Sequence, residues 1–292
     1  MSPPVSVIVS SFDRPNLLAD ALRSIAWQAY DGPIEIIICD DYSTDPNVEL
    51  TITRFAATWP DRFTVTEARP EHPPVNSLER IYGGRCALGI NAGLAVATGR
   101  YVVFLPDDDF LTPHSIACRV AYLEAHPQAL ICFGRLEACK PETGVAWPHD
   151  DLRQHWHAAW PSATMTYGKY DGDTFTRCVH DRNGFFAKAP ITRAANYVDH
   201  GMVMVCRDRR PLPDWPEHRT CEITHGDQTA EHIWTTTPPA GWQVAEEFDC
   251  PDAGWFYRLE QGGYGPFHPV DEVVIVKRYH KWGHRGDPSR RE

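Results

Sequence analysis

The sequence predicts an α/β fold, with a doubly wound, mostly parallel sheet followed by an irregular second half. Three observations support this prediction. Apolar, strand-like runs alternate with helical patterns over residues 4–135, as in sheets whose crossovers are helices. The run over residues 101–105 is apolar or aromatic at every position, which is typical of a buried parallel strand. Beyond about residue 140, Pro, Trp, His and Gly become frequent and the periodicity weakens. We therefore expect one domain with an α/β half over 1–140 and an irregular half over 141–292.

The elements of the first half follow one another in strand and helix order. Strands are expected where apolar or β-branched runs are continuous, and helices where apolar residues recur every three or four positions. Pro15 suits the first turn of a helix, and Gly99 suits the position just past the end of another. The expected strands are 5–9, 34–39, 63–66, 101–105 and 129–134, and the expected helices are 15–25, 45–58, 86–97 and 115–125.

Three elements can be predicted in the second half. Residues 200–206 and 270–276 are apolar or β-branched runs that are typical of strands. Gly226 and Asp227 precede a predicted helix over 228–234. The chain ends in a basic segment from residue 277 onward, which follows the last predicted strand.

Three consecutive carboxylates, Asp107, Asp108 and Asp109, directly follow the predicted strand 101–105. They are therefore expected at the carboxyl edge of the sheet, where open α/β folds bind their ligands. A set of oxygen ligands suits Mg²⁺ or Mn²⁺, and these metals commonly carry a diphosphate. The alternative is a solvated acidic turn with no ligand.

The composition narrows the class of protein. A net charge of −11 argues against a nucleic-acid groove or an anionic membrane surface as the main partner. The nine cysteines form no Cys-x-x-Cys pair, so they are expected to be reduced thiols of a cytoplasmic protein. We expect no signal peptide, because Met1 is followed within a few residues by the first predicted strand. We expect no transmembrane segment, because no apolar stretch reaches the roughly 18–20 residues that cross a bilayer.

Segments 5–15, 36–45 and 91–101, the last running into the three aspartates, together resemble one family. The chain resembles inverting family 2 glycosyltransferases of the GT-A fold, and is similar to the spore-coat polysaccharide type. The resemblance covers residues 4–135 well and continues thinly to Asp227. It implies metal-dependent transfer of a sugar from a nucleoside-diphosphate sugar, with UDP favoured, to an acceptor. That acceptor, whether a glycan, small molecule, peptide or modified base, is left open.

By this resemblance, Phe12 stacks on the nucleotide base and Asp41 accepts a hydrogen bond from the base imide. A carboxylate facing an N–H group between two carbonyls suits uracil or thymine. Ser10 and Arg80 lie near the nucleotide, and Asp107 lies near the ribose and the metal. The alternatives are turn and helix-cap duty for Asp41 and a solvated helix face for Arg80.

The metal ligands also follow from the resemblance. The usual family signature is Asp-x-Asp-Asp, and this chain departs from it with Pro106 in the first position. The register makes Asp108 the main ligand of Mn²⁺ or Mg²⁺ and Asp109 a water-mediated partner, whereas a plain Asp-x-Asp reading uses Asp107 and Asp109. His280 resembles a histidine that follows the family's last strand and approaches the metal or the diphosphate.

Inversion requires one carboxylate that removes a proton from the acceptor. The family places this base at the start of a helix in the second half, which matches Asp227, with Glu231 four residues on as the other candidate. A simple helix cap at Asp227, worth about 1 kcal/mol, is the alternative. His200 precedes a strand that resembles the family's acceptor-side strand. Arg278 belongs to the basic C-terminal segment, whose cations would close over the diphosphate, and the alternative is a frayed basic tail.

Two other functions fit the same sheet. A sugar-nucleotide pyrophosphorylase would need a Gly-rich phosphate loop after the first strand, and residues 10–15 contain no glycine. A catalytically inactive module that binds sugar nucleotides or glycans would not need the aspartates at 41, 108 and 227, although Pro106 slightly favours it.

Overall fold

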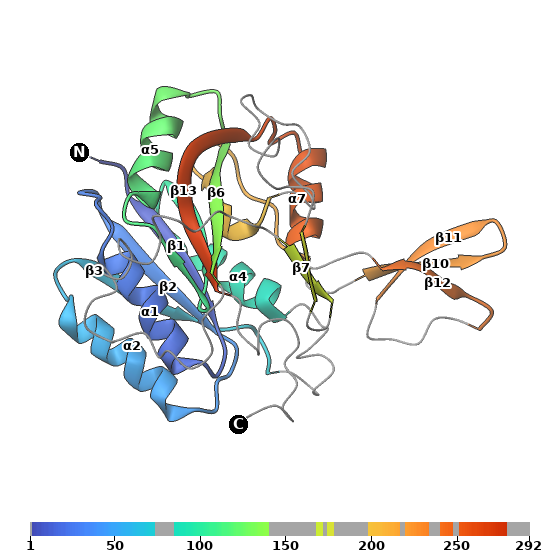
Figure 1. The fold of residues 1–292 in the computed structure, drawn as a ribbon, viewed down its shortest axis with the longest axis horizontal. Helices are drawn as coiled ribbons and strands as arrows, with labels where there is room; N and C mark the ends of the chain where they lie inside the picture. Colours follow the sequence, from blue (N-terminus) through green and yellow to red (C-terminus); the bar gives the residue numbers. More distant parts are fainter. Residues whose placement is uncertain are drawn as a thin grey trace.

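The computed structural model describes the following residues of the chain: 2–73, 85–139, 168–171, 174–177, 198–216, 220–233, 240–247 and 251–278. Its centre is an eight-stranded sheet in the order β3-β2-β1-β4-β9-β6-β13-β5. Figure 1 shows this sheet with helices packed against it and a small separate sheet extending from the body. The architecture confirms the predicted α/β class with a mostly parallel sheet.

Four neighbouring strands form the parallel part of the sheet. Three of them are almost entirely buried, as their apolar runs predicted, whereas the edge strand over 63–68 is buried only at its two ends. β1 lies in the middle and pairs in parallel with β2 on one side and β4 on the other, while β3 pairs with β2. The strands are β1 (Val5–Ser11), β2 (Ile34–Asp40), β3 (Phe63–Ala68) and β4 (Tyr101–Pro106).

The rest of the sheet mixes both strand directions. β9 (Val203–Cys206) runs antiparallel to β4 and to β6 (Ile131–Cys139). β13 (His268–Arg278) runs parallel to β6 and antiparallel to the short edge strand β5 (Asp109–Leu111). Strands from both halves of the sequence therefore belong to one sheet.

Helices follow the strands as the sequence predicted. Pro15 opens α1, and the side chain of Asp45 caps α2 by accepting a hydrogen bond from the backbone N–H of Asn47 at 2.9 Å. α1 packs against α2, and α4 packs against β1 and β2. The helices are α1 (Pro15–Ala26), α2 (Pro46–Thr58), α4 (Arg85–Val96), α5 (Ser115–Ala125) and α7 (Pro251–Gln261).

α7 was not predicted, and it contributes to an aromatic cluster in the core. Trp255 of α7 stacks on Trp215 with ring centroids 4.9 Å apart. Phe104 of β4 meets both indoles edge-on, at 5.4 and 5.2 Å. All three rings are buried, so these tryptophans stabilise the core.

The structure contradicts the predicted helix after Asp227. Residues 228–233 form a strand instead of a helix: β10 (Thr220–His225) and β11 (Gln228–Ile233) form an antiparallel hairpin, and β12 (Gln243–Glu247) completes a three-stranded sheet. His225 pairs with Gln228, so Gly226 and Asp227 form a two-residue loop. Gly226 has a φ of +59°, the conformation that a hairpin loop of this length needs at its first position.

A second correction concerns the predicted strand 200–206. Its first part is a short 3₁₀ turn, η1 (His200–Met202), because Asp199 caps the turn by accepting a hydrogen bond from the N–H of Gly201 at 2.9 Å. A further hairpin, β7 (Gly168–Asp171) with β8 (Thr174–Arg177), was not predicted.

Two further features bear on the sequence-based expectations. Within the described residues, no helix is both long and apolar enough to cross a membrane. The cysteines whose state the structure describes are free thiols, as expected: Cys39, Cys86, Cys118, Cys132 and Cys206.

Candidate active site

The candidate site lies at the carboxyl ends of β1, β2 and β4. Two backbone hydrogen bonds join the three strand ends: the N–H of Asp41 donates to the carbonyl of Ser11 at 2.9 Å, and that of Asp107 donates to the carbonyl of Ser10 at 3.0 Å. The N–H of Phe12 donates to Asp107 Oδ2 at 3.2 Å. Ser10, Phe12, Asp41 and Asp107 therefore lie along one edge, as the sequence predicted for the ends of parallel strands.

The three consecutive aspartates occupy different environments. The side chain of Asp107 is fully buried, that of Asp108 is 21% exposed, and Asp109 is buried as the first residue of β5. Asp109 lies opposite Lys277 in the β5–β13 pairing. A solvated acidic turn is therefore excluded, because two of the three carboxylates are withdrawn from water.

Burial changes the acidity of Asp107. Desolvation raises the pKa of this carboxyl to about 6, with a further rise from Asp108, whereas Arg14 and the N–H of Phe12 act in the opposite direction. A buried carboxylate of this kind favours a nearby cation, which offsets its charge.

Arg14 supplies such a cation. Its guanidinium contacts Asp107 Oδ1 at 2.5 Å and Asp108 Oδ2 at 2.8 Å. Burial lowers the pKa of Arg14, but the two carboxylates outweigh this and raise it above its ordinary value. Sequence reasoning missed Arg14 as a site residue, although its place between the end of β1 and Pro15 of α1 was a usable signal.

Asp41 also binds an arginine that sequence reasoning missed. Arg85, the first residue of α4, donates from Nε and Nη2 to Asp41 Oδ1, at 2.9 Å for Nε, and from Nη2 to the carbonyl of His72 at 2.9 Å. Arg85 is 4% exposed. The pair fixes the Asp41 carboxylate at the edge, so Asp41 does not serve as a helix cap; Asp45 caps α2.

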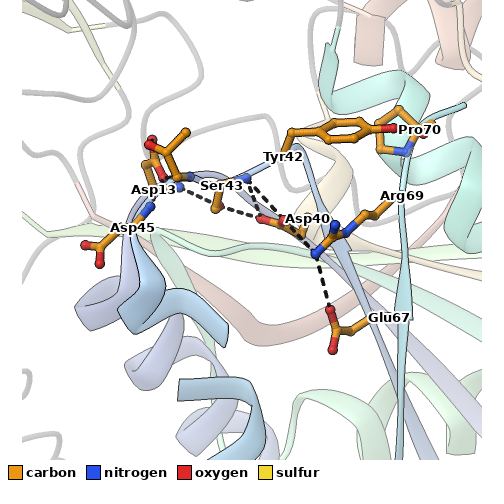
Figure 2. A network of polar contacts seen from close by, with 9 residues as sticks. Asp13, Asp40, Tyr42, Ser43, Asp45, Glu67, Arg69 and Pro70 are labelled. Carbon is orange, nitrogen blue, oxygen red and sulfur yellow. Dashed lines mark hydrogen bonds and ion pairs between the residues drawn. The ribbon is translucent and has the colours of Figure 1, made fainter. Parts of the chain in front are cut away.

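Asp40, the neighbour of Asp41, makes contacts that hold two loops together (Figure 2). It accepts hydrogen bonds from the N–H and hydroxyl of Ser43, and the guanidinium of Arg69 lies 3.7 Å away. Ser43 in turn accepts from the N–H of Asp13, whose carboxylate accepts from the N–H of Asp45. These contacts join the β1–α1 loop to the β2–α2 loop and hold the shape of both.

His200 lies in the η1 turn that precedes β9, next to this edge. Because β9 runs antiparallel to β4, the η1 turn before β9 packs against the carboxyl-terminal part of β4. The His200 ring meets Trp215 edge-on with centroids 5.3 Å apart, and its Nδ1 lies 3.8 Å from Asp199 Oδ1.

The predicted base is placed elsewhere. Asp227 is exposed in the β10–β11 loop, and Figure 1 shows this hairpin extending away from the main sheet. Glu231 lies on β11 and Arg278 ends β13, whereas Arg80 and His280 lie outside the described residues. Within the part of the chain that the structure describes, no three His, Cys, Asp or Glu side chains are grouped to hold a metal ion.

Several solved structures share this fold. TarS residues 1–349 from S. aureus, in complex with UDP, aligns with a TM-score of 0.55 at 13% identity, covering 94% of this chain and 60% of that one. The mannosyltransferase PcManGT from Pyrobaculum calidifontis, in complex with GDP-Man and Mn²⁺, aligns with a TM-score of 0.53 at 17% identity, covering 97% of this chain and 59% of that one.

Curated relatives match the first half of the chain. The putative glycosyltransferase EpsE of Bacillus subtilis is 32% identical over 124 residues, which are 42% of this chain and 40% of EpsE. The uncharacterised protein y4gI of Sinorhizobium fredii is 30% identical over 132 residues, which are 45% of this chain and 13% of that protein. The chain thus matches less than half the length of these relatives. The family model described as "Glycosyl transferase family 2" matches residues 6–189, more than half of the chain, and the chain belongs to that family.

Proposed function

We propose that this protein transfers a sugar from a nucleoside-diphosphate sugar, with UDP as the nucleotide, to an acceptor, inverting the anomeric configuration. Family membership supports transfer of a glycosyl group. The observation that carries the assignment to this edge is the arrangement of Asp41 and Asp107, each bonded through its backbone to the end of β1. Ligands of open α/β sheets bind in this position.

For the nucleotide base we propose Asp41 as the residue that selects uracil. Arg85 holds its carboxylate at the strand end. A carboxylate is an acceptor only, and the uracil imide is a donor between two carbonyls, so the two groups match. Phe12 would stack on the base, with Ser10 and Arg80 nearby. The two solved structures hold UDP and GDP-Man respectively, so the fold alone does not choose the base.

For the metal we propose Mn²⁺ or Mg²⁺, held by Asp108 with help from Asp107, Asp109 and His280. The carboxylate oxygens fit a hard cation that completes its coordination with substrate phosphates and water, which is how Mg²⁺ is usually bound. The diphosphate would supply further ligands to the metal. When bound, the metal would offset the charge of the leaving diphosphate.

For the transfer step we propose Asp227 as general base, with Glu231 as the second candidate. The base takes a proton from the acceptor, whose oxygen or nitrogen attacks the anomeric carbon opposite the leaving nucleoside diphosphate. His200 and Arg278 would act on the acceptor and diphosphate side. Asp227 is exposed on the β10–β11 loop, so it would act as the base only on an acceptor that this loop meets at the bound donor.

The nucleotide assignment is tested by calorimetric titration of UDP, dTDP and GDP in the presence of Mn²⁺, with wild type and Asp41→Asn. We expect wild type to bind UDP at least about tenfold more tightly than GDP, which corresponds to about 1.4 kcal/mol. The Asp41→Asn variant should lose most of this preference, because an amide can also donate to a base carbonyl. Tighter binding of GDP by wild type would contradict the role of Asp41 in selecting uracil.

A further inference from the structure

Arg14 is built into the candidate metal site. Its guanidinium bridges two carboxylates that lie 93 and 94 residues away in the sequence, and it contacts Asp107 Oδ1 and Asp108 Oδ2. These are two of the carboxylates proposed above as metal ligands. Arg14 and a divalent cation therefore need the same oxygens.

The backbone that carries Arg14 is fixed in place. The preceding residue, Asp13, has a φ of +49°, a conformation that non-glycine residues rarely adopt without support. That support is the network in Figure 2, in which the N–H of Asp13 donates to Ser43 Oγ and its carboxylate accepts from the N–H of Asp45. Pro15 follows Arg14 and opens α1. The guanidinium thus enters the acidic edge from a supported loop.

The charges explain why a cation is present there. Asp107 is fully buried, and Asp108 carries a second carboxylate next to it in the chain. Placing two negative charges together in a site withdrawn from water is unfavourable unless a cation offsets them. Arg14 offsets both at once, because its planar fork presents separate N–H donors to the two carboxylates.

We propose that Arg14 is an internal counter-ion that holds the metal ligands until the donor arrives, and then moves from the carboxylates to the diphosphate. This rests on the proposed function of the same edge. Without nucleotide, Arg14 keeps the affinity for a free divalent cation low. When metal and diphosphate bind together, the phosphates offer Arg14 a new anionic partner of suitable geometry. Metal and nucleotide therefore bind cooperatively, each raising the affinity of the other.

The test compares binding of Mn²⁺ alone to nucleotide-free wild type, Arg14→Gln and Arg23→Gln, with free Mn²⁺ measured by electron paramagnetic resonance. Arg23 is a matched control, because its side chain is also 33% exposed and pairs with a carboxylate, that of Asp20, within the same helix α1. We expect Arg14→Gln to bind Mn²⁺ about tenfold more tightly than wild type, and Arg23→Gln to match wild type.

A second variant, Arg14→Lys, keeps the proposal testable if Arg14→Gln fails to fold. Arg14→Lys keeps the charge but lacks the fork, so it can offset only one carboxylate well and should bind Mn²⁺ more tightly than wild type and less tightly than Arg14→Gln. In the presence of Mn²⁺, both Arg14 variants should bind UDP more weakly than wild type. Equal Mn²⁺ affinity in all folded variants, or weaker binding by the Arg14 variants, would overturn the proposal.

The same measurements separate this proposal from the proposed function. If wild type binds no nucleotide with or without Mn²⁺, the proposed donor site fails. The Arg14 variants then still report whether the guanidinium competes with a cation for Asp107 and Asp108. If wild type binds UDP and Mn²⁺ cooperatively but Arg14→Gln shows no gain for Mn²⁺ alone, the donor site stands and the counter-ion role of Arg14 fails.

Discussion

At the scale of single residues, two arginines organise the acidic edge of the sheet. Arg14 bridges Asp107 and Asp108, and Arg85 binds Asp41. The second pair is the more deeply buried, with side chains 4% and 10% exposed. Ion pairs of this kind cost much to break from one side, because the remaining charge stays buried without compensation. Arg85 thus couples the stability of the fold to the shape of the proposed nucleotide site.

We therefore predict that Arg85→Met lowers the free energy of unfolding by about 3 kcal/mol, measured by urea denaturation. The double variant Arg85→Met/Asp41→Asn should lose less than the sum of the two single variants, because it leaves no unpaired buried charge. Additive effects would contradict a direct energetic link between Arg85 and Asp41.

Sequence reasoning predicted the acidic residues of this edge but not their arginine partners. The position of Asp107 follows from a local pattern, a continuous apolar run that must end at a sheet edge. The partner of Asp107 depends on how a loop 93 residues earlier in the chain folds beside it, which no local pattern records. The same reason applies to Arg85 and Asp41, which lie 44 residues apart.

At the scale of elements, the β10–β11 hairpin is where sequence reasoning was wrong. The four-residue spacing of Asp227 and Glu231 suggested a helix face. The alternative signal was present as well, because a two-residue Gly-Asp loop between segments rich in Thr and Ile is typical of a hairpin. The resemblance to a family whose base begins a helix outweighed that local signal. The role of Asp227 itself stays a prediction.

If Asp227 is the general base, its replacement should reduce sugar transfer without weakening nucleotide binding. We predict that Asp227→Asn leaves the dissociation constant for UDP within about twofold of wild type, since Asp227 is exposed on a hairpin outside the β1–β2–β4 edge. Sugar transfer should fall by about a hundredfold or more, the usual contribution of a general base. Both are measured on the UDP-sugar that wild type uses most efficiently.

Asp31→Asn is a suitable control for Asp227→Asn, because Asp31 is also exposed and lies in the loop between α1 and β2. It should change neither quantity. Unchanged transfer by Asp227→Asn would remove Asp227 as the base and shift attention to Glu231. Parallel loss of nucleotide binding and transfer would instead indicate a structural role for the hairpin loop.

At the scale of the whole molecule, the acidic residues of the proposed site lie at one edge of the sheet, and other parts of the structure contribute to stability alone. His268, at the start of β13, lies outside the proposed site. It is buried, and its Nδ1 lies 3.1 Å from the hydroxyl of Tyr122 on α5. Burial, and then the neighbouring His126, lower the pKa of His268. The folded state therefore keeps this ring neutral at a pH where the unfolded chain protonates it.

The neutral state of His268 makes the stability of the protein depend on pH. Because the folded-state pKa of His268 lies below its ordinary value of 6.5, its contribution to stability is fully present above pH 6.5 and is lost as the pH falls. We predict that the melting temperature of His268→Asn declines less steeply below pH 6.5 than that of wild type. Asn keeps a side-chain acceptor for Tyr122. Identical slopes would show that His268 is protonated equally in both states.

Asp107 changes the stability with pH in the opposite direction in the same experiment. Its pKa is raised to about 6, so the stability it contributes is present at low pH and is lost as the pH rises through that value. The comparison must therefore be made between variants that both retain Asp107. A buried carboxyl whose pKa is raised by desolvation at the end of a sheet strand agrees with a binding role for the edge it occupies.

The central claim is that metal and nucleotide bind together at the carboxyl ends of β1, β2 and β4. It is tested most directly by calorimetric titration of UDP with and without Mn²⁺, using wild type, Asp108→Ala and the control Asp20→Ala, which removes a carboxylate of the α1 surface pair with Arg23. We predict that Mn²⁺ strengthens UDP binding by wild type and by Asp20→Ala. In Asp108→Ala, with its fold intact, the factor by which Mn²⁺ strengthens UDP binding should be at least about tenfold smaller. Metal-dependent UDP binding that is unchanged in Asp108→Ala would contradict the claim.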